Sequence, residues 1–146
     1  MDASIAGGIF ALIAGLVTLI SGKYSDRVKE NELIVVLGYL ITGLGFFLHL
    51  WVNSVTSLFL VQVVTGLGGA IYAPAFDSVY SKHLTQSRSG SQWGAWESTN
   101  YFTTALGAIF GGAIATYIGF RALFVVMAGL CFCSGLYIYR LKRNIL

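Results

Sequence analysis

Five long apolar stretches joined by short polar turns make up most of this chain, and they limit what it can fold into. They cover residues 5–20, 33–52, 58–79, 93–118 and 122–141. A helix needs about 20 apolar residues to cross a bilayer, and each stretch meets or approaches that length. The pattern therefore predicts five membrane-spanning helices. The first stretch is short for a full span, so we expect the chain to start late within a larger helical unit.

The composition excludes an ordinary soluble domain. The chain has 146 residues, of which 56% are hydrophobic and 10% charged. Soluble domains carry about 25% charged residues. A chain of this length cannot enclose so much apolar surface in a core of its own, so we expect the lipid bilayer to be its partner.

The basic residues alternate between the turns. The first turn has Lys23, Arg27 and Lys29, the second has none, the third has Lys82 and Arg88, the fourth has Arg121, and the end has Arg140, Lys142 and Arg143. Basic turns stay on the cytoplasmic side of a membrane. The pattern predicts a multi-pass protein of the cell (inner) membrane with Met1 outside and the C-terminus in the cytoplasm, and only Arg121 departs from it. The distribution argues against nucleic acid as a partner, although the net charge is +3. No basic residue precedes stretch 5–20, which argues against a signal peptide.

Small residues recur at helical spacing in these stretches. Thr65, Gly69, Ala73 and Asp77 form a stripe with Gly66 beside it, and Thr103, Gly107, Gly111 and Ala115 form another. Such stripes let helix backbones approach closely in lipid. We predict a packed bundle in which Gly66, Gly69, Gly107 and Gly111 lie at helix contacts. Because the turns are short, helices that follow one another should be antiparallel neighbours, and Asn31 is the expected N-cap of the second helix.

Residue patterns of enzymes are missing from the sequence. His49 and His83 are isolated, no Cys or His cluster has metal-ligand spacing, and Cys131 and Cys133 fall on different faces of one helix. Neither a phosphate-binding glycine loop nor a nucleophile with an oriented base is present. The sequence thus predicts no enzyme activity, no cofactor and no metal.

Two acidic residues fall inside predicted spans. Intramembrane carboxylates are costly and are candidates for function. Asp77 lies about one turn from the cytoplasmic end of its stretch, where it either pairs with a basic residue such as Arg27 or acts functionally. Glu97 is either a structural partner or a site for a proton or cation. Asn100, Tyr101 and Thr104 lie near it and are candidates for lining a cavity, whereas Trp93 and Trp96 suit either a cavity or an interfacial belt.

The first turn carries the most specific motif. Gly22, Ser25, Asp26 and Arg27 match four positions of the pattern G-x-L-a-D-R-x-G-R, while Tyr24, Lys29 and Glu30 depart from it. In this turn the chain resembles the major facilitator superfamily of transporters, whose members have twelve helices in two six-helix halves. The pattern resembles the weaker copy of the motif, which belongs to the second half.

The resemblance extends over nearly the whole chain. Gln62, Gly66 and Gly68 resemble the fourth helix of a half, and residues 106–112 with Gly119 to Arg121 resemble the fifth helix and the turn after it. It implies an all-α integral membrane fold in which residues 1–146 form five helices of a six-helix half, as helices eight to twelve of a transporter.

The resemblance also implies a role for the chain. The family's loop aspartate faces a helix N-terminus of the other half, and the loop arginine helps to lock one state. Carried over, Gly22, Asp26 and Arg27 are gating residues, with Asp77 as their partner. The chain would be part of a secondary transporter for a small-molecule substrate, inactive without the missing N-terminal half. The alternative is a small stand-alone helical membrane protein that packs against a partner. Substrate, coupling ion and direction stay open.

Overall fold

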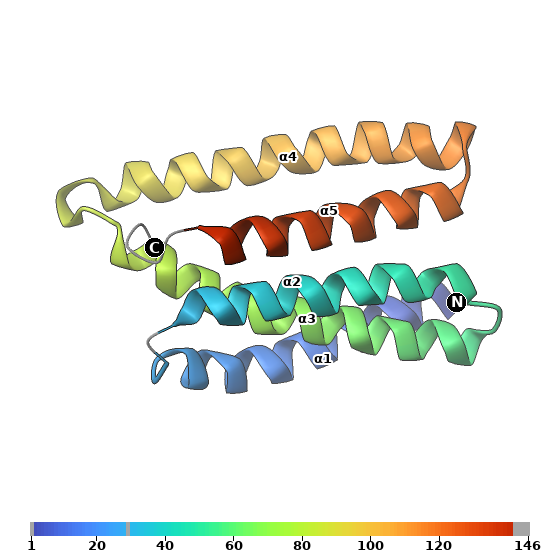
Figure 1. The fold of residues 1–146 in the computed structure, drawn as a ribbon, viewed down its shortest axis with the longest axis horizontal. Helices are drawn as coiled ribbons and strands as arrows, with labels where there is room; N and C mark the ends of the chain where they lie inside the picture. Colours follow the sequence, from blue (N-terminus) through green and yellow to red (C-terminus); the bar gives the residue numbers. More distant parts are fainter. Residues whose placement is uncertain (1, 29, 142–146) are drawn as a thin grey trace.

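The computed structural model describes residues 2–28 and 30–141, and within them it is a bundle of long α-helices without strands (Figure 1). The helices are α1 (Asp2–Ser25), α2 (Asn31–Leu48), α3 (Val55–Lys82), α4 (Ser89–Tyr117) and α5 (Phe120–Arg140), with short 3-10 turns η1 (His49–Trp51) and η2 (Gln86–Arg88). This confirms the predicted all-α class and the five helices.

The helices mostly extend beyond the apolar stretches that predicted them. α1 begins at Asp2 and ends at Ser25, and α4 begins at Ser89, because helical hydrogen bonding continues into polar residues that a hydropathy pattern leaves out. α3 begins with a capping box, in which the Ser54 hydroxyl accepts the Ser57 N–H at 3.2 Å and the Ser57 hydroxyl accepts the Ser54 N–H at 3.1 Å. The expectation that Asn31 caps α2 was wrong. Glu30 occupies the cap position, with no side-chain cap hydrogen bond, and Asn31 is already helical.

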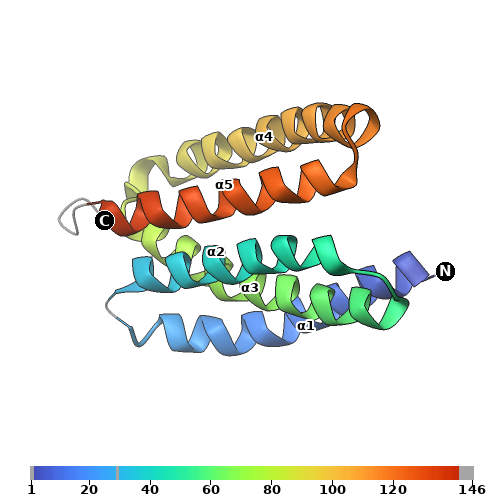
Figure 2. The ribbon, with the colours of Figure 1, turned by 45° about the vertical axis from the view of Figure 1, so that its right-hand side comes forward.

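The order of the helices in space differs from their order in the chain. α3 packs against both α1 and α2, α5 packs on α2, and α4 lies beside α5 (Figures 1 and 2). The expected adjacency of sequential helices holds for α2 with α3 and for α4 with α5. It is wrong for α1 and α2, because α3 lies between them, and α3 meets α4 only where α3 ends and α4 begins.

The tightest packing is the crossing of α2 and α3, where glycines face the opposite backbone. A Cβ atom added to Gly38 would lie 2.5 Å from the Cβ of Tyr72, and one added to Gly45 would lie 2.5 Å from the Oγ1 of Thr65. One added to Gly68 would overlap the hydroxyl of Thr42. Only glycine allows the two helix backbones to come this close. Close packing stabilises the contact of helices in a membrane, where the hydrophobic effect does not hold them together.

Helix α4 is the least covered element. None of its residues is buried, and Tyr101 is 71% exposed and Ile109 67% exposed. Of the described helices, three are long and apolar enough to cross a membrane: Asn31–Trp51, α3 and α5. α1 has a shorter apolar segment, Ala11–Ser25. The sequence predicted five spans, and length and apolarity support three of them directly.

Candidate functional site

Most of the charged residues of the described chain lie at one end of the bundle, which we call the charged end. There α1, α3 and α5 end and α2 and α4 begin (Figure 1). It carries Lys23, Asp26, Arg27, Glu32, Lys82, Arg88 and Arg140. Arg121 lies at the opposite end, in the first turn of α5.

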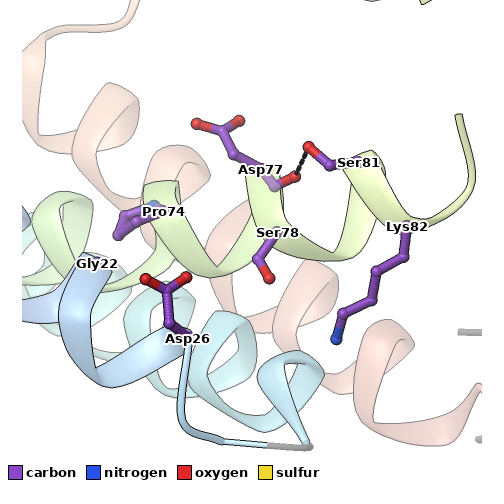
Figure 3. Close-up of a pocket in the computed structure, with 7 residues that line it drawn as sticks. All are labelled: Gly22, Asp26, Pro74, Asp77, Ser78, Ser81 and Lys82. Carbon is purple, nitrogen blue, oxygen red and sulfur yellow. Dashed lines mark hydrogen bonds between the residues drawn. The ribbon is translucent and has the colours of Figure 1, made fainter. Parts of the chain in front are cut away.

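A groove of about 570 Å³ between α1 and α3 opens at the charged end (Figure 3). It is lined by Gly22, Asp26, Pro74, Asp77, Ser78, Ser81 and Lys82. Three of the four predicted gating residues, Gly22, Asp26 and Asp77, therefore line one groove. The fourth, Arg27, is exposed and follows Asp26 in the turn after α1.

A chain of buried hydrogen bonds fixes the groove. The Ser25 hydroxyl, 2% exposed, donates to the Asn31 side-chain oxygen at 3.0 Å. The Asn31 amide donates to the Ser78 hydroxyl at 2.9 Å. These bonds join the end of α1, the start of α2 and α3, so they place Asp26 beside α3. The motif pointed to Ser25 only as a small residue and did not reveal Asn31 or Ser78. Asn31 and Ser78 could have been found as polar residues on those faces of their helices that pack against other helices.

The Asp77 side chain points away from Asp26 and Lys82, as Figure 3 shows, while its backbone carbonyl accepts a hydrogen bond from the Ser81 hydroxyl at 2.6 Å. Asp77 and Glu97 directly follow Phe76 of α3 and Trp96 of α4, whose ring centroids lie 4.6 Å apart. The two predicted intramembrane acids therefore lie on neighbouring parts of two helices. The predicted partnership of Asp77 with Asp26 and Arg27 stays a prediction.

The candidate cavity residues share one face of α4. Glu97, Asn100, Tyr101 and Thr104 have the spacing i, i+3, i+4 and i+7, which places them on one stripe of a helix. All four are exposed, as are all residues from 97 to 110 of α4. Within the described residues, this polar face is therefore left uncovered along with the rest of the middle of the helix.

An aromatic cluster anchors the start of α4 to the end of α3. The ring of Phe76 lies 4.6 Å from that of Trp96, and the ring of Tyr80 lies 5.0 Å from that of Trp93. The Tyr80 hydroxyl donates to the carbonyl oxygen of Gln92 at 2.7 Å. These contacts hold Glu97, the residue after Trp96, near α3.

The four predicted packing glycines have different surroundings. Gly66 is buried in α3, and a Cβ added to Gly111 would lie 3.6 Å from the Leu123 side chain. Gly69 and Gly107 have no atom within 4 Å of such a Cβ. Their role in helix packing stays a prediction, because no other part of the described chain covers them. Among the described residues, no group of three or more His, Cys, Asp or Glu side chains is placed to hold a metal ion.

Comparison with known proteins gives a consistent result. The family model of the Major Facilitator Superfamily matches residues 1–144. The Tetracenomycin C resistance and export protein of Streptomyces glaucescens is 27% identical over 122 residues, which are 82% of this chain and 22% of that protein. Multidrug resistance protein MdtG of Salmonella paratyphi B is 25% identical over 141 residues, which are 94% of this chain and 35% of that protein. The chain thus spans between a fifth and about a third of these relatives. No solved structure matches it.

Proposed function

The chain belongs to the major facilitator superfamily, and from that premise we propose that it is the C-terminal part, helices eight to twelve, of a secondary transporter. In such a protein two halves rock about a site near the middle of the membrane and expose it to each side in turn. The relatives are three to five times longer than the matched region, which supports a part rather than a whole.

The observation that carries this proposal is the polar face of α4. Glu97, Asn100, Tyr101 and Thr104 are exposed on one stripe of a helix in a membrane protein. Polar side chains at membrane depth are costly unless they face protein or water. A second wall, supplied by the missing N-terminal half, would turn this face into one side of an aqueous path. We propose Asn100, Tyr101 and Thr104 as lining residues of that path.

The groove between α1 and α3 is the proposed switch. A carboxylate near a helix N-terminus gains about 0.3 to 1 kcal/mol when exposed and more when partly buried. If Asp26 meets a helix of the other half in one state only, this energy biases the two states without fixing either. The Ser25–Asn31–Ser78 bonds hold the end of α1 beside α3, and this arrangement supports the proposal that Gly22 and Asp26 act in the switch. Arg27 and Asp77 complete the proposed set.

The relatives' names favour a class of substrate. One is named for resistance to and export of tetracenomycin C and the other for multidrug resistance. We propose export of a small organic molecule, with the charged end and the C-terminus on the cytoplasmic side of the inner membrane, as the basic turns indicate. Alone, the chain would not transport, because it supplies only one wall of the path.

The test uses the chain joined to its N-terminal half in inverted membrane vesicles. Glu97→Gln should abolish the pH dependence of substrate flux, because it removes the proposed proton site and keeps the side-chain size. The conservative control, Glu97→Asp, keeps an ionisable group and should retain the pH dependence. Flux by Glu97→Gln that follows pH as the wild type does would assign Glu97 a structural role. Absence of any flux by the joined wild-type protein, with every substrate tried, would favour the alternative of a stand-alone partner protein.

A further inference from the structure

The last two turns of α3, residues 74–82, lie between two neighbouring helices. One face of these turns lines the groove with α1 (Figure 3), through Pro74, Asp77, Ser78, Ser81 and Lys82. The opposite face carries the rings of Phe76 and Tyr80, since positions 74 and 76 are about 200° apart around a helix of 3.6 residues per turn. These rings pack on two tryptophans at the start of α4, Trp93 and Trp96. We call residues 74–82 the shared segment, because both α1 and α4 contact it.

Two hydrogen bonds hold the shared segment from its two sides. The Ser78 hydroxyl accepts from the Asn31 amide at 2.9 Å, and Asn31 is bonded in turn to Ser25 at the end of α1. The Tyr80 hydroxyl donates to the carbonyl oxygen of Gln92, near the start of α4, at 2.7 Å. Ser78 and Tyr80 are only two residues apart on one helix. A displacement of the start of α4 should therefore also displace the side of α3 that lines the groove.

The ring of Trp96 links Glu97 to the shared segment. Its centroid lies 4.6 Å from that of Phe76 and 5.8 Å from that of Tyr80, and Glu97 is the next residue of α4. Glu97 is exposed. An ionised carboxylate favours water, whereas a protonated one tolerates apolar surroundings. A change in the charge of Glu97 therefore favours a different position of the start of α4 against the rest of the bundle.

The elements next to Glu97 supply few other groups that titrate or carry charge. They are Asp77, Tyr80 and Lys82 of α3, His83 and Arg88 in the turn before α4, and Tyr101 of α4. α5, which packs beside α4, carries Arg121 and Arg140 at its ends and only tyrosines and cysteines as titratable groups between them. Asp77 is the only other acidic residue in positions 55–141, and it belongs to the shared segment.

We propose that Tyr80 and Trp96 are positioning residues that couple protonation of Glu97 to the groove between α1 and α3. They hold the start of α4 on the shared segment, so the two move together when the charge of Glu97 changes. This inference rests on the proposed role of Glu97 as a proton site. It adds that the proton acts on the switch residues Gly22 and Asp26 through α3, by way of the aromatic cluster.

The test follows the groove by cysteine labelling of the chain joined to its N-terminal half, in inverted membrane vesicles. With Cys131 and Cys133 replaced by serine, Ser81→Cys reports on the groove. Ser87→Cys, exposed in the turn before α4, is the reference for the effect of pH on the maleimide reaction itself. Couplings between sites commonly change an equilibrium at least about fivefold, so the relative labelling rate of Ser81→Cys should change by that factor with pH. Glu97→Gln should abolish the change.

Trp96→Leu should also abolish the labelling response to pH, although Glu97 is still present, because it removes the ring that packs on the shared segment. Trp96→Phe keeps a ring and should retain the response. Phe102→Leu, at a position of α4 that is 71% exposed, is the matched control and should respond as the wild type does. A response that requires Glu97 but persists in Trp96→Leu would overturn the inference.

The inference and the proposed function fail in different ways. If Glu97→Gln loses the pH dependence of flux while the wild-type groove is labelled equally at every pH, only the coupling is overturned. A labelling response that persists in Glu97→Gln overturns both. If Trp96→Leu does not reach wild-type helical content, Tyr80→Phe tests the coupling with all four rings in place. It lacks the bond to Gln92 and should reduce the response at least about twofold, and an unchanged response would contradict the role of Tyr80.

Discussion

At the scale of residues, the candidate switch depends on a few polar side chains that the family motif does not contain. Asp26 lies in the groove because Ser25, Asn31 and Ser78 tie the end of α1 to α2 and α3. These bonds are shielded, with Asn31 1% exposed, so their loss leaves polar groups without partners in an apolar setting. The position of this motif residue therefore depends on neighbours that the motif does not contain.

Asn31→Ala should destabilise the fold by about 1 to 3 kcal/mol, because it strips hydrogen-bond partners from Ser25 and Ser78. Unfolding in a mixed detergent with rising denaturant, followed by helical circular dichroism, measures the change. Asn53→Ala is the control, since Asn53 lies in the exposed turn before α3. Equal stability of the two variants would contradict a structural role for the buried hydrogen bonds among Ser25, Asn31 and Ser78.

Adjacent glycines of α3 offer a sharper comparison. Gly68→Ala should destabilise the chain by about 1 to 3 kcal/mol, because its Cβ would overlap Thr42 of α2. Gly69→Ala meets no atom within 4 Å and should be neutral or slightly stabilising in the isolated chain, since Ala favours a helix by about 1 kcal/mol over Gly. The same denaturation experiment reads out both. If Gly69→Ala destabilised the chain more than Gly68→Ala, the close contact of α2 with α3 at Gly68 would be contradicted.

At the scale of helices, the aromatic cluster explains how α4 stays attached although none of its residues is buried. Trp93 and Trp96 pack on Phe76 and Tyr80, and the Tyr80 hydroxyl adds a hydrogen bond to the backbone of α4. Beyond this cluster α4 makes limited contacts with α5 near the opposite end. The first turns of α4 are thus held more firmly than its middle.

Tyr80→Phe should loosen the start of α4, because it removes the bond to the Gln92 carbonyl and keeps the ring. We expect amide hydrogen exchange of residues 90–97 to become about fivefold faster, which corresponds to about 1 kcal/mol of local stability. Tyr117→Phe, at a position that is 86% exposed, is the control and should leave this exchange unchanged. An unchanged rate in Tyr80→Phe would show that the rings alone hold α4.

The fold class and much of the candidate site were accessible from the sequence, and the reasons are local. Apolar length predicted the five helices, and the motif identified Gly22 and Asp26, which lie four residues apart at the end of α1 and the start of the turn after it. The contact of α1 with α3 was not accessible, since turn lengths say nothing about a helix that inserts between two others. The pairing of Asn31 with Ser78 and the glycine at position 68 facing Thr42 depend on that arrangement. These contacts can be identified only once the packing of helices that are distant in sequence is known.

At the scale of the whole molecule, the bundle is unevenly covered. α2 and α3 form a tight centre, whereas α4 exposes a polar face and large apolar side chains such as Phe102 and Leu106. Such a helix needs protein or water on its polar side. The proposed transporter supplies both, through a second half and a path between the halves.

This proposal predicts the genetic setting of the chain. The DNA immediately upstream of Met1 should continue as an open frame with about seven further apolar spans, which complete two six-helix halves. Sequencing the region decides the matter. A stop codon followed by a ribosome-binding site directly before Met1 would instead make the missing half a separate chain or favour the stand-alone alternative.

The most direct test of the central claim is the water accessibility of α4 in the proposed full-length transporter in native membranes. With Cys131 and Cys133 replaced by serine, Thr104→Cys places a thiol on the polar face and Leu106→Cys places one on a different face of the same helix. If the polar face lines an aqueous path, a membrane-impermeant maleimide will label Thr104→Cys and leave Leu106→Cys unlabelled. Equal failure to label both positions would mean that this face meets lipid or packed protein, and would contradict a transport path along α4.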